Sequence, residues 1–329
     1  MDALIFAVKA VLPIILMVGI GYILKCKGFM TEEFSLAANK LVFRVFLPCM
    51  LFLGVYRIES LDGIALDFVA YALIAEMAVV LISFVMITVL CRVKNRRGVL
   101  LQAAFRSNYA LIGLPLAMAL AGEGGVAVAS LLSVIFVPVI NVLSVIVLSV
   151  YGSGEGKPSA KKIALDIARN PLIISVLIGV LMLVVRWVLT SYSISFRFSD
   201  ITPVYDVVVF LSDMATPMAL LVLGARFEFS AVAELRRDII LGTLLRTVMA
   251  PLIGIGIAYL FFCDSFTGAH FAAFVCAFAT PVAVASVPMS QEMGGDSRLA
   301  GQLVVWTTIV SSLTLFLLAY LLRAAGIFA

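Results

Sequence analysis

Long apolar runs and short polar connections alternate along the whole chain. Ten runs have about the 20 residues that a membrane-spanning helix needs. They cover residues 3–24, 36–55, 67–91, 99–121, 125–150, 165–188, 204–225, 239–262, 269–290 and 301–323. The runs are continuously apolar, which indicates helices rather than the alternating strands of a membrane barrel. The pattern therefore predicts an all-α polytopic membrane protein with ten transmembrane helices.

Composition excludes most soluble functions. Of the 329 residues, 64% are hydrophobic and 13% are charged, whereas a soluble domain is about 45–50% apolar and about 25% charged. A soluble enzyme and a nucleic-acid-binding protein are therefore not expected, and the lipid bilayer surrounds most of the chain. The five cysteines are scattered and His270 is the single histidine, so no metal or cofactor is expected.

Basic residues are distributed unequally between the two sets of connections. The odd-numbered connections carry fourteen Lys and Arg residues: Lys25, Lys27, Arg92, Lys94, Arg96, Arg97, Lys157, Lys161, Lys162, Arg169, Arg226, Arg236, Arg237 and Arg298. The other side has Arg57, Arg197 and Arg323, with Arg186 near a helix end. Because cytoplasmic loops are enriched in basic residues, both termini are predicted on the non-cytoplasmic side of the cell membrane.

The two halves of the chain share proline landmarks. Corresponding pairs are Pro13 and Pro171, Pro48 and Pro217, and Pro115 and Pro288. The spacing predicts a five-helix repeat at 1–152, a short cytoplasmic linker at 153–164 and a second repeat at 165–329. Five is an odd number, so the second copy is expected to be inverted, as in many secondary transporters.

The fourth and ninth runs are the candidate site because each has a proline in its middle. Such a proline frees the carbonyl four residues earlier, here Leu111 or Val284, and this is tolerated in lipid where the group lines a cavity. Pro115 and Pro288 suit the first turn of a new half-helix, whose N–H groups and dipole attract an anion. The alternative is that both prolines simply kink their helices. The candidate substrate-binding residues are Ser107, Asn108, Tyr109, Gly113, Pro115, Thr280, Pro281, Ser286 and Pro288.

Ionisable residues inside the runs are costly and therefore suggest function. Glu76 and Asp213 are candidates for carrying a coupling proton, although each would equally suit a pair with a nearby cation. Arg106 lies about seven residues inside the cytoplasmic end of its run. It would either extend toward the aqueous phase or attract an anion.

The chain resembles the auxin efflux carrier family, which includes bacterial malate-permease-like carriers and plant auxin exporters. The resemblance rests on LVFRVFLPCMLF, RSNYALIGLPLAMALAGEGG, ARNPLIISVLIGVLM, MATPMALLVLGARF, LRTVMAPLIGIGIAYL and ATPVAVASVPMSQEMGGD, in this order. It implies crossed, broken helices 4 and 9 beside an organic-anion site, with Asn108 ahead of the first crossover proline. It further implies that helix 6 starts at Asn170-Pro171. It also implies a scaffold of helices 1, 2, 6 and 7, often dimerised, and a mobile transport domain of helices 3–5 and 8–10.

Two features depart from the family pattern. The long cytoplasmic loop of many plant carriers is missing, which favours a compact prokaryotic type of carrier. The stretch 283–287 has no polar residue besides Ser286.

The sequence thus predicts a carrier of small organic anions, such as malate or auxin-like acids, that exports them by elevator-type alternating access. An anion channel, or a proton- or sodium-coupled uptake symporter, remains the alternative. A membrane enzyme is not favoured because no acid cluster or Ser/His pair is present, and no signalling domain supports a sensory role. The expected partners are the anion, the lipid bilayer and a second copy of the chain.

Overall fold

The computed structural model describes residues 2–57, 65–152 and 160–328, and the named elements in these ranges are all helical. The first half contains α1 (Asp2–Cys26), α2 (Glu32–Leu41), η1 (Val42–Phe46), α3 (Leu47–Tyr56), α4 (Leu66–Leu90), α5 (Lys94–Phe105), η2 (Tyr109–Gly113) and α6 (Leu114–Tyr151). The second half contains α7 (Ala160–Arg169), α8 (Pro171–Ser191), η3 (Phe198–Asp200), α9 (Thr202–Asp213), α10 (Ala215–Ala225), α11 (Ser230–Leu244), η4 (Leu245–Met249), η5 (Leu252–Gly256), α12 (Ile257–Phe262), α13 (Gly268–Phe278), α14 (Ser286–Glu292) and α15 (Ser297–Ala324). In the described ranges the extended pairing is one isolated antiparallel bridge, between Ser107 and Val282.

Seven helical stretches of the described chain are long and apolar enough to cross a membrane. They are Glu32–Tyr56, Leu66–Leu90, Tyr109–Tyr151, Pro171–Ser191, Thr202–Ala225, Ser230–Phe262 and Ser297–Ala324, and Leu12–Cys26 and Gly268–Phe278 are shorter apolar helices. Leu66, Val89 and Trp187 are each more than 70% exposed. Large apolar side chains on the outside are expected where lipid is the solvent. The chain is therefore a multi-pass membrane protein, and the arrangement of ten helices stays a prediction.

Wide turns accommodate three of the prolines inside the helices. The five-residue π turns η1, η2 and η4 each end two residues before a proline, namely Pro48, Pro115 and Pro251. In each case the residue before the proline donates its N–H five residues back, from Leu47 to Val42, from Leu114 to Tyr109 and from Ala250 to Leu245. A proline ring clashes with the carbonyl four residues earlier, and the wider turn relieves that clash without ending the helix.

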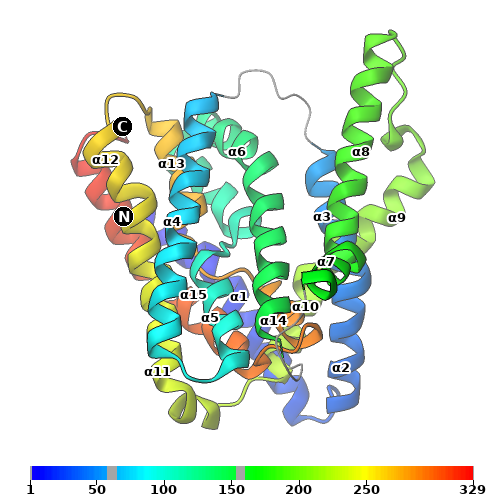
Figure 1. Cartoon of the computed structure of the whole chain (residues 1–329), viewed down its shortest axis with the longest axis vertical. Coiled ribbons are helices and arrows are strands. Elements are labelled where there is room, and N and C mark those ends of the chain that lie inside the picture. The colour runs from blue at the N-terminus through cyan, green and yellow to red at the C-terminus, as the bar shows by residue number, and fades with distance from the viewer. Residues whose placement is uncertain (1, 58–64, 153–159, 329) are drawn as a thin grey trace.

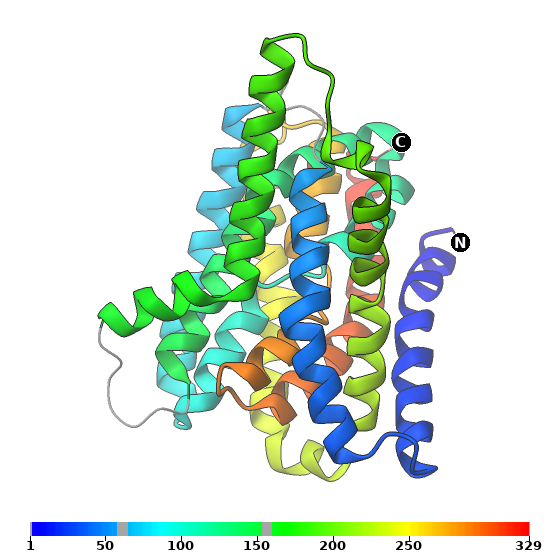
Figure 2. The ribbon, with the colours of Figure 1, turned by 90° about the vertical axis from the view of Figure 1, so that its right-hand side faces the viewer.

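Most helices run roughly parallel to one long axis, and α7 lies across them (Figures 1 and 2). Helix α1 packs against α10, α3 packs against α8, and α6 packs against α13. The contact between α1 and α10 is close because a Cβ on Gly21 would lie 2.2 Å from the Leu221 carbonyl oxygen. A Cβ on Gly224 would lie 2.0 Å from the Val18 carbonyl oxygen. Glycine is thus required on both helices at this contact.

Two predicted boundaries can be compared with the structure. Asn170 caps α8 by accepting the Leu172 N–H at 2.9 Å, with Pro171 in the first turn, so the helix start at this Asn-Pro pair is confirmed. The gap expected after residue 121 is a turn within α6, where Ala121 and Gly122 leave the helical region and Gly122 has φ +61°. Most of the predicted linker, including Lys157, lies outside the described residues.

An ionic cluster fixes the end of the bundle that lies at the bottom of Figure 1. Arg96 of α5 contacts Asp296 at 3.0 Å, Asp238 at 3.1 Å and Glu234 at 3.2 Å, and so joins α5, α11 and the start of α15. Partial burial lowers the pKa of Arg96, but the hydrogen bonds and charges of Asp296 and Asp238 outweigh it and raise the pKa. The guanidinium therefore stays charged.

Candidate functional site

The two helix breaks meet in the middle of the molecule. After α5 the backbone is non-helical from Arg106 to Asn108, and after α13 it is non-helical before α14 begins at Ser286. The Asn108 N–H donates to the Pro281 carbonyl at 2.8 Å, and the Ala283 N–H donates to the Arg106 carbonyl at 3.1 Å. We call these two antiparallel segments, 106–108 and 279–285, the crossover.

Arg246 of η4 holds the crossover from one side. It is fully buried, and its guanidinium donates to the carbonyls of Thr280 at 2.7 Å and Ala277 at 2.8 Å. It also donates to Phe105 at 3.2 Å and Ala104 at 3.3 Å. The final carbonyls of a helix carry partial negative charge and have no partner within the helix. One guanidinium therefore satisfies the ends of both α5 and α13.

A cavity of about 210 Å³ lies on the other side of the crossover. Its wall combines residues 106–111 and 283–285 with parts of α3, α6, α8 and α10. Most of this wall is apolar, including Leu51, Val137 and Ala219. Here the crossover faces α3, α8 and α10, helices to which it is not directly connected.

The polar groups that face this cavity are incompletely satisfied. Arg106 is 4% exposed, and its Nε and Nη1 have no hydrogen-bond partner among the described residues. The same holds for Ser107 Oγ, Asn108 Nδ2 and Asn141 Oδ1. A buried polar group without a partner costs free energy, and a buried charge costs much more. Arg106, Ser107 and Asn108, which we call the Arg106 cluster, hold the unsatisfied donors and are therefore suited to an anion that accepts several hydrogen bonds.

The structure brings some of the predicted site residues to this cavity and leaves others away from it. Arg106, Ser107, Asn108 and Tyr109 line it. The Tyr109 hydroxyl, however, donates to the Ala129 carbonyl at 2.8 Å, so its hydrogen bond is structural. The predicted residues that do not line the cavity are Gly113, Pro115, Thr280, Pro281, Ser286 and Pro288.

Those six residues support the crossover in other ways. A Cβ on Gly113 would lie 2.9 Å from that of Cys276, so Gly113 lets η2 approach α13. Thr280 donates its hydroxyl to the Cys276 carbonyl at 2.8 Å, and the Pro281 carbonyl accepts from Asn108. Ser286 is buried, and its Oγ has no partner within the described ranges.

The role expected for the prolines needs correction. Pro115 and Pro288 lie in the first turns of α6 and α14 as predicted, but Pro115 is exposed and the chain is already helical from Tyr109. The N–H groups of Ile112 and Gly113 are occupied by the Asn108 carbonyl. The freed Val284 carbonyl accepts the Val287 N–H at 3.2 Å. The π turn thus moves the break seven residues ahead of Pro115, and the donors left without a partner there belong to side chains.

The two candidate carboxylates lie away from the cavity. Glu76 is fully buried in α4, and neither of its oxygens has a hydrogen-bond partner among the described residues; Arg246 is the charge that acts on it. Asp213 is exposed at the end of α9. A coupling role for either residue stays a prediction.

Sequence reasoning missed Asn141. It is 1% exposed on α6 and lines the cavity with Pro138 and Ser133 on the same face of the helix. The available signal was one amide inside an apolar run, three residues after a proline. No group of three or more His, Cys, Asp or Glu that could hold a metal lies within the described part of the chain.

Comparison with known proteins agrees with this architecture. The family model described as membrane transport protein matches residues 6–157 and 156–319. An uncharacterized transporter of Methanothermobacter thermautotrophicus is 26% identical over 318 residues, which covers 93% of this chain and 95% of that protein. An uncharacterized transporter of Methanocaldococcus jannaschii is 25% identical over 219 residues, which covers 65% of this chain and 67% of that protein.

The matches cover both halves of the chain. They show that the protein is a membrane transporter rather than an enzyme. The chain belongs to the membrane transport protein family, the auxin efflux carrier family that its sequence motifs resemble.

Proposed function

We propose that the protein carries small organic anions and binds their carboxylate at the Arg106 cluster. The observation that carries this proposal is a buried guanidinium with unsatisfied N–H groups at a cavity beside a broken helix. A guanidinium recognises a carboxylate through two parallel charge-assisted hydrogen bonds. The amide of Asn108 supplies a further donor for the same anion.

The cavity favours a monocarboxylate with an apolar body. Arg106 is the charged residue in its wall, so a second carboxylate, as in malate, would face apolar side chains such as Val137 and Val176. Burying an unpaired charge is strongly unfavourable. A cavity of about 150 Å³ holds benzene, so about 210 Å³ suits a single aromatic ring or a short branched chain with its carboxylate.

The proposed mechanism is elevator-type alternating access. The scaffold would comprise α1, α2–α3, α8 and α9–α10, and the transport domain would comprise α4–α6 and α11–α15. The packing of α1 on α10 and of α3 on α8 supports this division. It also supports the ten crossings and the two inverted repeats. The matched breaks of the two halves support them as well. The cavity lies between the two groups of helices, where a moving crossover would expose it to each side in turn.

Export is the proposed direction. An inside-negative potential of 100 mV contributes about 2.3 kcal/mol per charge, which favours outward movement of a monoanion about fifty-fold. Export therefore needs no coupling ion. Uptake would need one, and Glu76 would then be the central residue. A homodimer formed through the scaffold, in the cell membrane, completes the proposal.

The test compares fluxes in vesicles that contain the purified protein. Phenylacetate, with one ring and one carboxylate, should cross faster than malate. Arg106→Gln removes a charge-assisted hydrogen bond worth about 1.5–3 kcal/mol, so apparent affinity should fall about ten- to a hundredfold. Arg44→Gln is the matched control, because Arg44 is an exposed arginine of η1 that does not line the cavity.

Each alternative has its own outcome. Equal phenylacetate flux in Arg106→Gln and the unmodified protein would overturn the assignment of the site. Faster transport of malate than of phenylacetate would overturn the substrate class. Discrete single-channel currents in a planar bilayer would favour an anion channel, and flux that requires a proton or sodium gradient would favour a symporter.

A further inference from the structure

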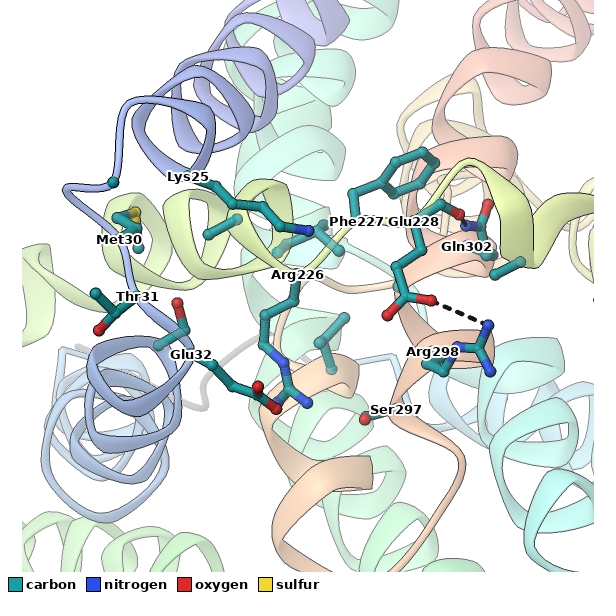
Figure 3. Close-up of a pocket in the computed structure, with 17 residues that line it drawn as sticks. Lys25, Met30, Thr31, Glu32, Arg226, Phe227, Glu228, Ser297, Arg298 and Gln302 are labelled. Carbon is teal, nitrogen blue, oxygen red and sulfur yellow. Dashed lines mark hydrogen bonds and ion pairs between the residues drawn. The ribbon is translucent and has the colours of Figure 1, made fainter.

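A second and larger cavity, of about 370 Å³, lies toward the end of the bundle that carries the basic connections (Figure 3). It is formed by the end of α1 and the start of α2, the end of α10 and its connection to α11, and parts of α14 and α15. It reaches the surface, since Lys25 and Glu32 in its wall are exposed. The proposed mechanism makes no use of this cavity, which we call the vestibule.

The vestibule and the Arg106 cavity adjoin the same short segment of chain. Val284 and Ala285 of the crossover line the Arg106 cavity, whereas Val287, in the first turn of α14, lines the vestibule. One residue, Ser286, therefore separates the two walls along the chain. A ligand in the vestibule lies next to the part of the chain that leads to Arg106.

Three cations from three different elements line the vestibule, together with two carboxylates. The cations are Lys25, Arg226 and Arg298, and the carboxylates are Glu32 and Glu228. Arg298 is engaged, because it contacts Glu228 at 3.0 Å and Glu234 at 3.4 Å. The remaining charges in the wall are two cations against one exposed carboxylate.

Lys25 and Arg226 retain free hydrogen-bond donors. Lys25 has no hydrogen bond or ion pair with any described residue, and Figure 3 shows its ammonium extending into the vestibule. Arg226 uses Nη1 on Gln291 of α14, which leaves other N–H groups of its fork. Both ends of the buried Gln302 amide are already used, by the Glu228 carbonyl and by Trp306. The open donors of the vestibule are thus mainly cationic.

We propose that the vestibule is a loading site, in which Lys25 and Arg226 bind the carboxylate of the transported anion before it passes α14 to reach Arg106. The inference rests on the proposed function. A cleft lined by positive charge and low-dielectric walls raises the local concentration of anions. It also supplies hydrogen bonds while the anion loses part of its water, before it meets the apolar wall of the inner cavity.

The experiment measures initial phenylacetate rates in inside-out and right-side-out membrane vesicles. Lys25→Gln should raise the KM about two- to fivefold at the face where Lys25 lies, the size expected for one exposed charge, and leave kcat unchanged. At the opposite face the KM should stay the same. Lys25→Arg should restore the original KM, because it keeps the charge.

Lys27→Gln is the matched control. Lys27 is an exposed lysine of the same connection and does not line the vestibule. It should leave the KM unchanged at both faces. High salt should raise the KM of the unmodified protein more than that of Lys25→Gln, since exposed charges are screened. An equal effect of Lys25→Gln and Lys27→Gln would show attraction by general surface charge and overturn the loading site.

A lipid phosphate is an anion like the proposed carboxylate ligand and could bind the same cations. A second experiment therefore distinguishes a lipid headgroup from the transported anion. The Lys25→Gln effect should persist in vesicles of pure phosphatidylcholine. An effect that requires phosphatidylglycerol would show that an anionic headgroup occupies the vestibule and would overturn the proposal.

A direct binding measurement tests the loading site independently of the proposed function. Excess phenylacetate should slow acylation of Lys25 by an amine reagent, read by mass spectrometry, and should not slow acylation of Lys27. Protection of Lys25 together with full transport by Arg106→Gln would reject the Arg106 site and retain the loading site. Equal acylation of Lys25 with and without phenylacetate would reject the loading site alone.

Discussion

At the residue scale, Arg246 organises the centre of the protein. Four carbonyls at the ends of two half-helices accept its N–H groups, and they come from Ala104, Phe105, Ala277 and Thr280. Glu76 is buried in the same part of the protein but forms no direct hydrogen bond with Arg246. A planar fork with five N–H donors can serve two separate helix ends, whereas a lysine ammonium is a single point.

Arg246→Met should therefore destabilise the protein severely. It leaves four buried carbonyls without their donor, and each unsatisfied buried group costs about 1–3 kcal/mol. Thermal unfolding in detergent should show a large fall in Tm, and Arg246→Lys should recover only part of it. An unchanged Tm in Arg246→Met would contradict this role of the guanidinium.

At the element scale, glycines and prolines determine how the helices fit together. The π turns η1, η2 and η4 each let a proline stay inside a helix, and paired glycines let α1 and α10 touch along their backbones. In lipid, association of helices depends on such close packing, because the apolar solvent provides no hydrophobic driving force. The contact between α1 and α10 should therefore be sensitive to a single methyl group.

Gly21→Ala should lower the Tm, since its Cβ would meet the Leu221 backbone at 2.2 Å and the two helices would have to separate. Overpacking of this kind costs about 1–3 kcal/mol. Gly19→Ala on the same helix is the control, because a Cβ there has no atom within 4 Å. Thermal unfolding of both variants checks the expectation, and equal Tm values would show that α1 and α10 are not held at this distance.

The sequence predicted much of the element scale. The length of the apolar runs predicted the helices. Local chemistry predicted the start of α8 at Asn170-Pro171 and the polar residues ahead of Pro115. The sequence did not predict the π turns, because propensity does not distinguish a kink at Pro115 from a wider turn before it. The sequence also did not predict that Asn141 lines the cavity or that Arg246 binds four carbonyls. Both depend on which helices become neighbours.

At the scale of the whole molecule, the basic connections gather at one end. Arg96, Arg226 and Arg298 belong to this end, as does the connection that carries Lys25 (Figure 1). The positive-inside rule predicts that this end faces the cytoplasm. Cys26 is exposed beside Lys25, whereas Cys263 follows α12 at the other end of the bundle.

A membrane-impermeant maleimide can therefore test the orientation. A Cys49→Ser/Cys263→Ser variant keeps Cys26 as the exposed thiol, because Cys91 and Cys276 are buried. It should be labelled in inside-out vesicles and stay unlabelled in right-side-out vesicles. A variant that keeps Cys263 in place of Cys26 should show the reverse pattern. Labelling of Cys26 from outside intact cells would invert the topology.

The unpaired guanidinium of Arg106 has a consequence for the electrical work of a transport cycle. In the proposed mechanism a bound monocarboxylate neutralises Arg106, so the loaded transport domain carries one positive charge fewer than the empty one. The cell's voltage would therefore act more strongly on the return of the empty carrier, drawing the vacant site back to the cytoplasm. A monoanion exporter could in this way be driven by the step that resets its carrier.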